Sequence, residues 1–422
     1  MNILLITDDF YPNSGGVAHT MMNLYNFSRL KRQTIFIFNP NINDKDIYKN
    51  LKFLKDYTIK HLINSILRRN FLQFALLSAW KIIKDRKIPF SQKMRIILHF
   101  LIKPRKLIWV IENIISVYPY MKRLDFGVIM GGNSYQILDL NFVLSRLLNK
   151  KLICMAHGDD FLIPWNIVFK TLFHKSIYFQ YADKIILSNE INKYLIKRTH
   201  HLDDNKLEVI YRAINIKDLK INQSKFELRK EFNIPEKQFV LLSVGVHRFI
   251  KRFDLVIQAV HRIKQKNPEL DLRYYLIGEG PETPKLKKLT IDLRLENEVV
   301  FLGRCDMEKR NKYYKLSDVF IMPSMSTKSN IEGFGITFIE ANYYKVPVIG
   351  AHSGGIPAVI KDGINGLLIK QNDVDDLVNK VLFLYKNEDL RKEMGEKGHK
   401  QVISQYVWDK IIDDYIKIFE SL

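Results

Sequence analysis

The sequence has few cysteines, few acidic residues and no long apolar run. Cys154 and Cys305 are the only cysteines among 422 residues, and each adjoins a strand-like stretch, so we expect buried free thiols and neither a disulfide nor a metal site. No run reaches the roughly 18 to 20 apolar residues that span a bilayer. The start of the chain, residues 1–16, places acids directly after a short apolar strand, unlike a cleavable signal. We therefore expect a cytoplasmic chain, or one on the cytoplasmic face of the inner membrane.

The shortage of acidic residues leaves 66 Lys and Arg against 45 Asp and Glu, a net charge of +21. About half of this charge lies in residues 61–123, which hold 13 basic residues and two acids, Asp85 and Glu112, interleaved with Leu, Phe and Trp. Basic residues among large apolar ones are typical of helices in a membrane interface. Nucleic acid is the competing partner, but no module that reads DNA or RNA is recognisable, so none is expected. An ordinary helical insertion whose charges face water stays open as the third reading.

The chain is long enough for two domains, each with its own core. Strand-like apolar runs alternate with helical stretches, which predicts the α/β class with parallel sheets covered on both faces. The polar stretch 214–236 predicts the junction between the two domains. The expected strands are residues 2–7, 34–39, 126–131, 151–157, 184–189, 207–212, 239–245, 272–278, 299–303, 319–324 and 346–351.

Two carboxylates near residue 336, Glu332 and Glu340, flank a glycine-rich turn. Gly333 and Gly335 let the backbone approach a ligand closely. The residues from Ile336 onward contain no helix breaker, and the free N–H groups at the start of the expected helix suit a phosphate. Glu332 would lie at the ligand, and Glu340, one turn inside the helix, could accept hydrogen bonds from a sugar diol. The alternative is that Glu332 caps the helix and Glu340 is a solvated helix residue.

Seven ordered motifs and one early glycine pair run along the chain: GG (15–16), HGDD (157–160), RAIN (212–215), SVGVHRFIKRFDLVIQA (243–259), LIGEGP (276–281), FLGR (301–304), EGFGITFIEA (332–341) and SGGIPAVIKDGINGLLI (353–369). Together they resemble family 4 retaining glycosyltransferases of the GT-B fold. That fold has two Rossmann-like parallel-sheet domains that face each other across a cleft. The resemblance implies an N-terminal domain of residues 1–214, with an insertion at about 61–123, completed by an amphipathic helix at 405–422. It implies a donor-binding domain of residues 215–404.

In the donor-binding domain, the resemblance implies that Arg248 and Lys251 hold the diphosphate, for which a guanidinium and an ammonium are suitable cations. A solvated helix start is the alternative for this basic run. The resemblance assigns Glu332 to the transferred sugar and Glu340 to the ribose. The other implied donor contacts are the backbone amides of Gly333, Phe334, Gly335 and Ile336, and the base pocket near Arg304.

In the N-terminal domain, the resemblance implies that the loop with Gly15 and Gly16 closes on the donor phosphates and the acceptor; a plain turn is the alternative. His157 follows an apolar strand, at the sheet edge where open parallel sheets place ligands. The matching family histidine lies beside the sugar C6 hydroxyl, with Asp160 nearby, although a lone histidine can be purely structural. Asn133 and Ser134 stand where many relatives carry a histidine, so this chain departs from the family on the acceptor side.

The resemblance implies transfer of a sugar, with retention, from a UDP- or GDP-sugar to a bacterial surface glycan, and the basic, apolar segment 61–123 favours an acceptor carried on a lipid. The expected catalytic residues are Glu332, His157, Arg248 and Lys251. No cofactor or metal is expected, because two cations and a helix end offset the charge of the leaving diphosphate and no Asp-x-Asp motif is convincing. The alternatives are a nucleotide-sugar 2-epimerase of the same fold and an inactive donor-binding subunit.

Overall fold

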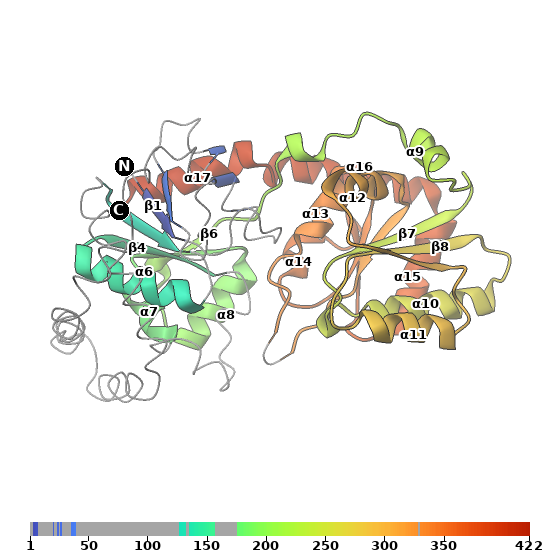
Figure 1. Cartoon of the computed structure of the whole chain (residues 1–422), viewed down its shortest axis with the longest axis horizontal. Coiled ribbons are helices and arrows are strands. Elements are labelled where there is room, and N and C mark those ends of the chain that lie inside the picture. The colour runs from blue at the N-terminus through green and yellow to red at the C-terminus, as the bar shows by residue number, and fades with distance from the viewer. Residues whose placement is uncertain are drawn as a thin grey trace, which may run out of the picture.

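The structure is a computed structural model of the whole chain. It describes residues 3–6, 20, 23–24, 26–27, 35–38, 126–131, 135–156, 175–327 and 330–422. These residues form two lobes, each built on one parallel sheet, which lie side by side in Figure 1. Both lobes have the α/β architecture that the alternating pattern predicts.

The first sheet has the strand order β2-β1-β3-β4-β5-β6, and each neighbouring pair is parallel. Its strands are rich in Ile, Leu and Val, and most of their described side chains are buried, as expected for a sheet covered on both faces. The strands are β1 (Ile3–Ile6), β2 (Ile35–Phe38), β3 (Val128–Gly131), β4 (Lys151–Ala156), β5 (Lys184–Leu187) and β6 (Leu207–Val209). The described helices of this lobe are α6 (Tyr135–Leu148), α7 (Lys175–Tyr181) and α8 (Glu190–His200).

The second sheet has the order β12-β11-β10-β7-β8-β9 and is also parallel throughout. Its strands are β7 (Phe239–Val244), β8 (Leu272–Ile277), β9 (Val299–Gly303), β10 (Val319–Met322), β11 (Val348–Ala351) and β12 (Gly366–Ile369). The helices are α9 (Lys225–Glu231), α10 (Phe253–Lys266), α11 (Thr283–Asp292), α12 (Met307–Leu316), α13 (Ile336–Tyr343), α14 (Ile356–Val359), α15 (Val374–Lys386) and α16 (Glu388–Gln405). Every strand expected from the sequence is present; β12, a short strand that begins with a glycine, was not predicted.

The last helix, α17 (Trp408–Glu420), returns to the first lobe (Figure 1). Its buried face, with Trp408, Ile412 and Tyr415, packs in one cluster with Ile3 and Val128 of the first sheet. Two chain segments therefore pass between the lobes, and they touch: the N–H of Ile214 donates to Tyr406 O at 2.8 Å, and the N–H of Trp408 donates to Ile214 O at 3.2 Å.

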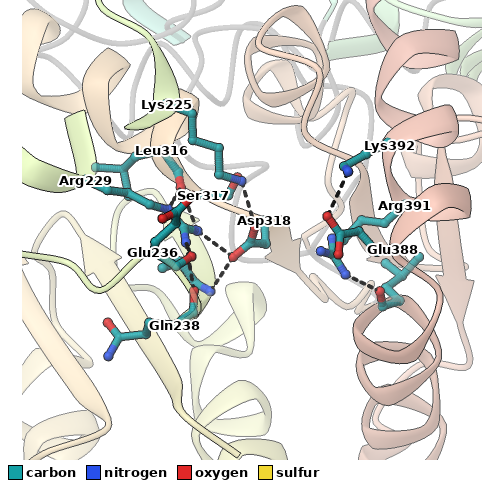
Figure 2. A network of polar contacts seen from close by, with 12 residues as sticks. Lys225, Arg229, Glu236, Gln238, Leu316, Ser317, Asp318, Glu388, Arg391 and Lys392 are labelled. Carbon is teal, nitrogen blue, oxygen red and sulfur yellow. Dashed lines mark hydrogen bonds and ion pairs between the residues drawn. The ribbon is translucent and has the colours of Figure 1, made fainter. Parts of the chain in front are cut away.

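A buried charge network fixes α9 against the amino end of the second sheet (Figure 2). The Asp318 carboxylate accepts hydrogen bonds of 2.7 Å from Lys225 Nζ, from Arg229 Nη2 and from the N–H of Val240. Arg229 also donates to the carbonyls of Glu236 and Gln238. Burial by itself would raise the pKa of Asp318, but Lys225 and Arg229 outweigh it and lower that pKa below its usual value. This network is structural, since it lies at the sheet edge opposite the carboxyl ends of the strands.

Both cysteines are free, as predicted; Cys154 is buried and Cys305 is partly buried. Burial raises the pKa of the Cys154 thiol to about 12, which makes it unreactive. Among the helices of the described ranges, none is both long enough and apolar enough to cross a membrane. The basic segment 61–123 lies outside the described residues.

Candidate active site

The order of the second sheet creates a point at which the chain reverses direction. The strands from β7 run outward to β8 and β9, and the chain then returns so that β10 pairs with the other side of β7. The loops that follow β7 and β10 therefore leave the same edge in opposite directions. Open α/β sheets bind ligands in the crevice at this position.

Lys251 and Glu332 meet at this crevice. Lys251 ends the short 3-10 helix Phe249–Lys251 after β7, and Glu332 lies in the loop after β10. The Lys251 ammonium and a Glu332 carboxylate oxygen form an ion pair, with side chains 19% and 14% exposed. Ser324 Oγ lies 3.5 Å from the same oxygen, and Lys251 Nζ lies 3.6 Å from Met322 Sδ. The structure thus joins two of the predicted site residues in a largely enclosed pair.

Arg248 stands at the start of the same 3-10 helix with an exposed side chain. No residue in the described ranges forms an ion pair with it. Its neighbours Val246 and Phe249 are also exposed, at 51% and 59%. Within the described part of the chain, the loop thus presents Arg248 as an exposed cation without an ion-pair partner, three residues before Lys251.

His247, which precedes Arg248, is fully buried and anchors this loop through hydrogen bonds. Its N–H donates to Glu279 O at 3.1 Å, and its carbonyl accepts from the N–H of Glu282 at 3.0 Å. His247 Nδ1 lies 2.8 Å from Thr283 Oγ1, which already accepts the N–H of Gly280 at 2.9 Å. The Thr283 hydroxyl is therefore free to donate to Nδ1, which suits a neutral imidazole. Burial lowers the pKa of His247, in the same direction.

Helix α13 begins at Ile336, as the sequence predicts, after Gly335 with a φ of 81°. A Cβ at Gly335 would lie 2.6 Å from the Phe338 ring, so glycine is required both for the backbone angle and for space. The first N–H groups of a helix have no partner within it, and α13 begins directly after the loop that holds Glu332. Phe334 is buried in the second lobe.

Glu340 is buried and already has protein partners. The hydroxyl of Tyr314 donates to one carboxylate oxygen at 2.8 Å, and Arg310 Nη2 lies 3.4 Å from the other. The Glu340 carboxylate raises the pKa of Arg310. Arg310 and Tyr314 could not be recognised from the sequence as partners of Glu340, because they lie on α12 and nothing in their local pattern indicates a partner on another helix.

The glycines at 354–355 support the Glu332 loop from behind. The N–H of Gly355 donates to Glu332 O at 2.7 Å, and a Cβ on Gly355 would lie 2.1 Å from Gly333 O. Gly354 has a φ of 50°, and its Cβ would lie 2.6 Å from Glu332 O. The role of this motif is thus to let two backbones pack in direct contact.

Several predicted site residues lie outside the described residues: Gly15, Gly16, Asn133, Ser134, His157 and Asp160. Arg304 is described; its side chain is 83% exposed and lies 3.3 Å from Glu279 at the edge of the β8 and β9 loops. Within the described ranges, no three His, Cys, Asp or Glu side chains are grouped so that they could hold a metal ion.

Comparison with known proteins agrees with this geometry. Residues 224–401 match the family described as glycosyl transferases group 1. The N-acetyl-alpha-D-glucosaminyl L-malate synthase of Bacillus anthracis is 31% identical over 227 residues, 53% of this chain and 57% of that protein. An uncharacterized glycosyltransferase of Methanocaldococcus jannaschii is 24% identical over 434 residues, 99% of this chain and 98% of the relative. The match to the Bacillus protein thus spans little more than half of its length.

The fold is shared over the whole chain. A crystal structure of Anabaena Alr3699/HepE in complex with UDP and glucose superimposes with a TM-score of 0.69 at 16% identity, and covers 100% of both chains. The structure has the GT-B fold, and its residues 224–401 match the family model of the glycosyl transferases group 1. The resemblance to glycosyltransferases of the GT-B fold that the motifs indicate is confirmed.

Proposed function

We propose that this protein transfers a sugar from a nucleotide diphosphate sugar to a hydroxyl group of an acceptor. The observation that carries this proposal is the pairing of Lys251 with Glu332 at the crevice between β7 and β10, beside the exposed Arg248. The crevice combines an uncompensated cation, a helix amino terminus and an enclosed carboxylate. The first two suit a diphosphate and the third suits sugar hydroxyls.

The donor is bound mainly by the second lobe in this proposal. Arg248 binds the diphosphate, and a second negative charge of the diphosphate forms an ion pair with Lys251 in place of Glu332. The carboxylate of Glu332 and the amides of Gly333 to Ile336 then face the sugar. Glu340, fixed by Tyr314 and Arg310, keeps its remaining lone pairs for the ribose diol. The UDP and glucose bound by the Anabaena protein support a nucleotide sugar as the donor.

The reaction proceeds with retention and without a metal ion in this proposal. As the glycosidic bond lengthens, negative charge develops on the leaving diphosphate, and Arg248, Lys251 and the α13 amino terminus stabilise it. The diphosphate oxygen then accepts the proton of the acceptor hydroxyl, which attacks from the same face. His157 and Asp160 are the proposed contacts on the opposite lobe. Nuclear magnetic resonance of the product anomer tests retention, and full activity in a chelator tests metal independence.

The acceptor in this proposal is a lipid-linked bacterial surface glycan. The support is the basic, apolar segment 61–123, which suits an anionic cytoplasmic membrane face. Co-sedimentation with liposomes that contain anionic lipid tests this part separately. Neutralising Arg68, Arg69, Lys103, Arg105 and Lys106 together should abolish binding; unchanged binding would refute the membrane contact.

A donor screen tests the function directly. Thermal shifts with UDP- and GDP-sugars identify the base, and product analysis with the donor that binds follows. Transfer to an acceptor supports the proposal, whereas release of a free epimerised sugar would identify a 2-epimerase. If no nucleotide sugar binds, the proposal fails. It also fails if a nucleotide sugar binds but none reacts, and Glu332→Ala and Lys251→Ala leave that binding unchanged.

A further inference from the structure

Among the described residues, the carbonyl of Gly333 makes polar contacts between the two lobes beside the candidate site. Asn189 Nδ2 donates to this oxygen at 2.5 Å and Asn192 Nδ2 at 3.0 Å, and Ser188 Oγ lies at 3.3 Å. All three donors belong to the first lobe, at the carboxyl end of β5 and the start of α8. Gly333 directly follows Glu332 in the chain. One backbone oxygen of the second lobe is thus bound by three side chains of the first.

The three donor side chains are oriented by hydrogen bonds within the first lobe. Asn189 is the N-cap of α8, and its Oδ1 accepts the N–H of Asn192 at 2.8 Å. Asn192 Nδ2 also donates to Ser188 Oγ at 2.8 Å, which leaves the Ser188 hydroxyl hydrogen free for Gly333. Asn189 and Asn192 have no exposed surface, and Ser188 has 2%. Helix capping therefore orients the amide groups of the first lobe toward the second.

The apolar residues on either side of this contact pack in the cores of different lobes. Ile331 packs in the core cluster of the first lobe, with Phe126 and Ile185. Phe334 packs in the core of the second lobe, and its ring lies 5.8 Å from that of Tyr406. The segment 331–334 is therefore held by both lobes, with Glu332 in the middle. Its position depends on how the lobes are arranged.

We propose that Ser188, Asn189 and Asn192 act as an interlobe latch whose engagement positions Glu332 and the amides of residues 333–336. The latch residues are positioning residues, because they act through the backbone of Gly333. When the latch opens, the loop loses its support from the first lobe and the donor site loosens. Donor binding and lobe closure are therefore linked. The effect on the donor rests on the function proposed above, whereas the latch itself does not.

The test substitutes Asn189→Asp and Asn192→Asp separately in the full chain. Asp is also a good N-cap, so Asn189→Asp keeps the cap of α8 and replaces only the amide donor with a carboxylate that repels the Gly333 carbonyl. We expect hydrogen exchange of the peptide 330–338 in the free protein to become about tenfold faster, the loss expected for one or two hydrogen bonds. Exchange of α8 should not change. The radius of gyration from small-angle scattering should increase.

Asn205→Asp is the matched control, because it makes the same charge change at an exposed position of the first lobe. It should leave exchange of 330–338 at the wild-type rate. If hydrogen exchange also rises throughout α8 in Asn189→Asp, the cap of α8 has been disturbed. Asn189→Ser is then measured in its place, since Ser is also a good N-cap and removes the side-chain amide that donates to Gly333. Two variants decide on the latch: Asn192→Asp, and whichever Asn189 variant preserves α8. If both show wild-type exchange of residues 330–338 and an unchanged radius of gyration, the latch proposal is overturned.

Titration with the donor identified in the screen separates the latch from the function. A latch variant that keeps the wild-type melting temperature but binds the donor about tenfold more weakly supports the link. Equal donor affinity in the wild type and in both variants would refute it. If the wild type binds no nucleotide sugar, the proposed function fails, while the exchange experiment still decides on the latch.

Discussion

Lys251 and Glu332 form an ion pair between two loops that are 81 residues apart in the chain. Both side chains are largely enclosed, so each charge depends on the other in the absence of a ligand. A diphosphate offers Lys251 a stronger partner and frees Glu332. The pair therefore connects the resting site to the proposed donor complex.

Replacing Lys251 with Ala should weaken donor binding and reduce turnover. The loss of one charged group that stabilises the leaving phosphate lowers kcat by roughly 10² to 10³. Steady-state kinetics with the identified donor measures this. Lys285→Ala is a matched control, because Lys285 also pairs with a glutamate, Glu282, at 3.0 Å but is 76% exposed on α11. An equal loss in both variants would contradict the role of Lys251.

Replacing Asp318 with Asn should destabilise the second lobe strongly. Arg229 and Lys225 would lose their charged partner at a buried position (Figure 2), which costs about 3 to 5 kcal/mol. Urea denaturation followed by circular dichroism measures the free energy of unfolding. Asp375→Asn removes the partner of Arg262 at a side chain that is 69% exposed, and it should leave the urea midpoint unchanged. Similar midpoints for the two variants would show that the network contributes little.

Stability should decrease as the pH falls, through two groups that act in different ranges. Burial holds the pKa of His247 below its usual value, so below about pH 6.5 the unfolded chain takes up the proton more readily than the folded one. Stability is therefore lost as the pH falls below that value. His247→Asn, which keeps an acceptor for Thr283, should flatten the dependence of the urea midpoint between pH 7.5 and 5. If the urea midpoint of His247→Asn depends on pH as steeply as that of the wild type, His247 is not the source of this pH dependence.

The second group, Asp318, acts at lower pH. Its pKa is lowered in the folded state because Lys225 and Arg229 outweigh the effect of burial. Its contribution is present above the unfolded value of about 3.9 and is lost as the pH falls through the folded pKa. Asp318→Asn should therefore reduce the acid sensitivity below pH 4 and leave the slope between pH 7.5 and 5 intact. Loss of the slope at the higher pH instead would contradict this assignment.

Replacing Gly355 with Ala should disturb the Glu332 loop. The new methyl group would lie 2.1 Å from Gly333 O and 2.6 Å from Asn189 Nδ2, so the loop or the latch must move. Overpacking of this kind costs about 1 to 3 kcal/mol. Gly245→Ala is the control, since its nearest contact is the Phe253 ring at 3.6 Å. Donor titration and thermal melts of both variants measure the effect, and equal values would contradict it.

The positions of most strands and the start of α13 can be predicted from the sequence alone. Short, mostly apolar runs between polar stretches predict β1 to β11, because a strand covered on both faces is largely apolar. The glycine at 335 and the absence of a breaker after it fix where α13 begins. The ordered motifs were sufficient to identify the family.

Which residues far apart in the chain come into contact depends on the tertiary structure. Strand order placed the loops after β7 and β10 together and so joined Lys251 to Glu332. The contacts of Arg310 with Glu340 and of Asn189 with Gly333 could not be predicted, because they join residues on separate elements and, for Asn189, on separate lobes. Local sequence carries period and turn chemistry, whereas these contacts depend on how sheets and helices pack in space.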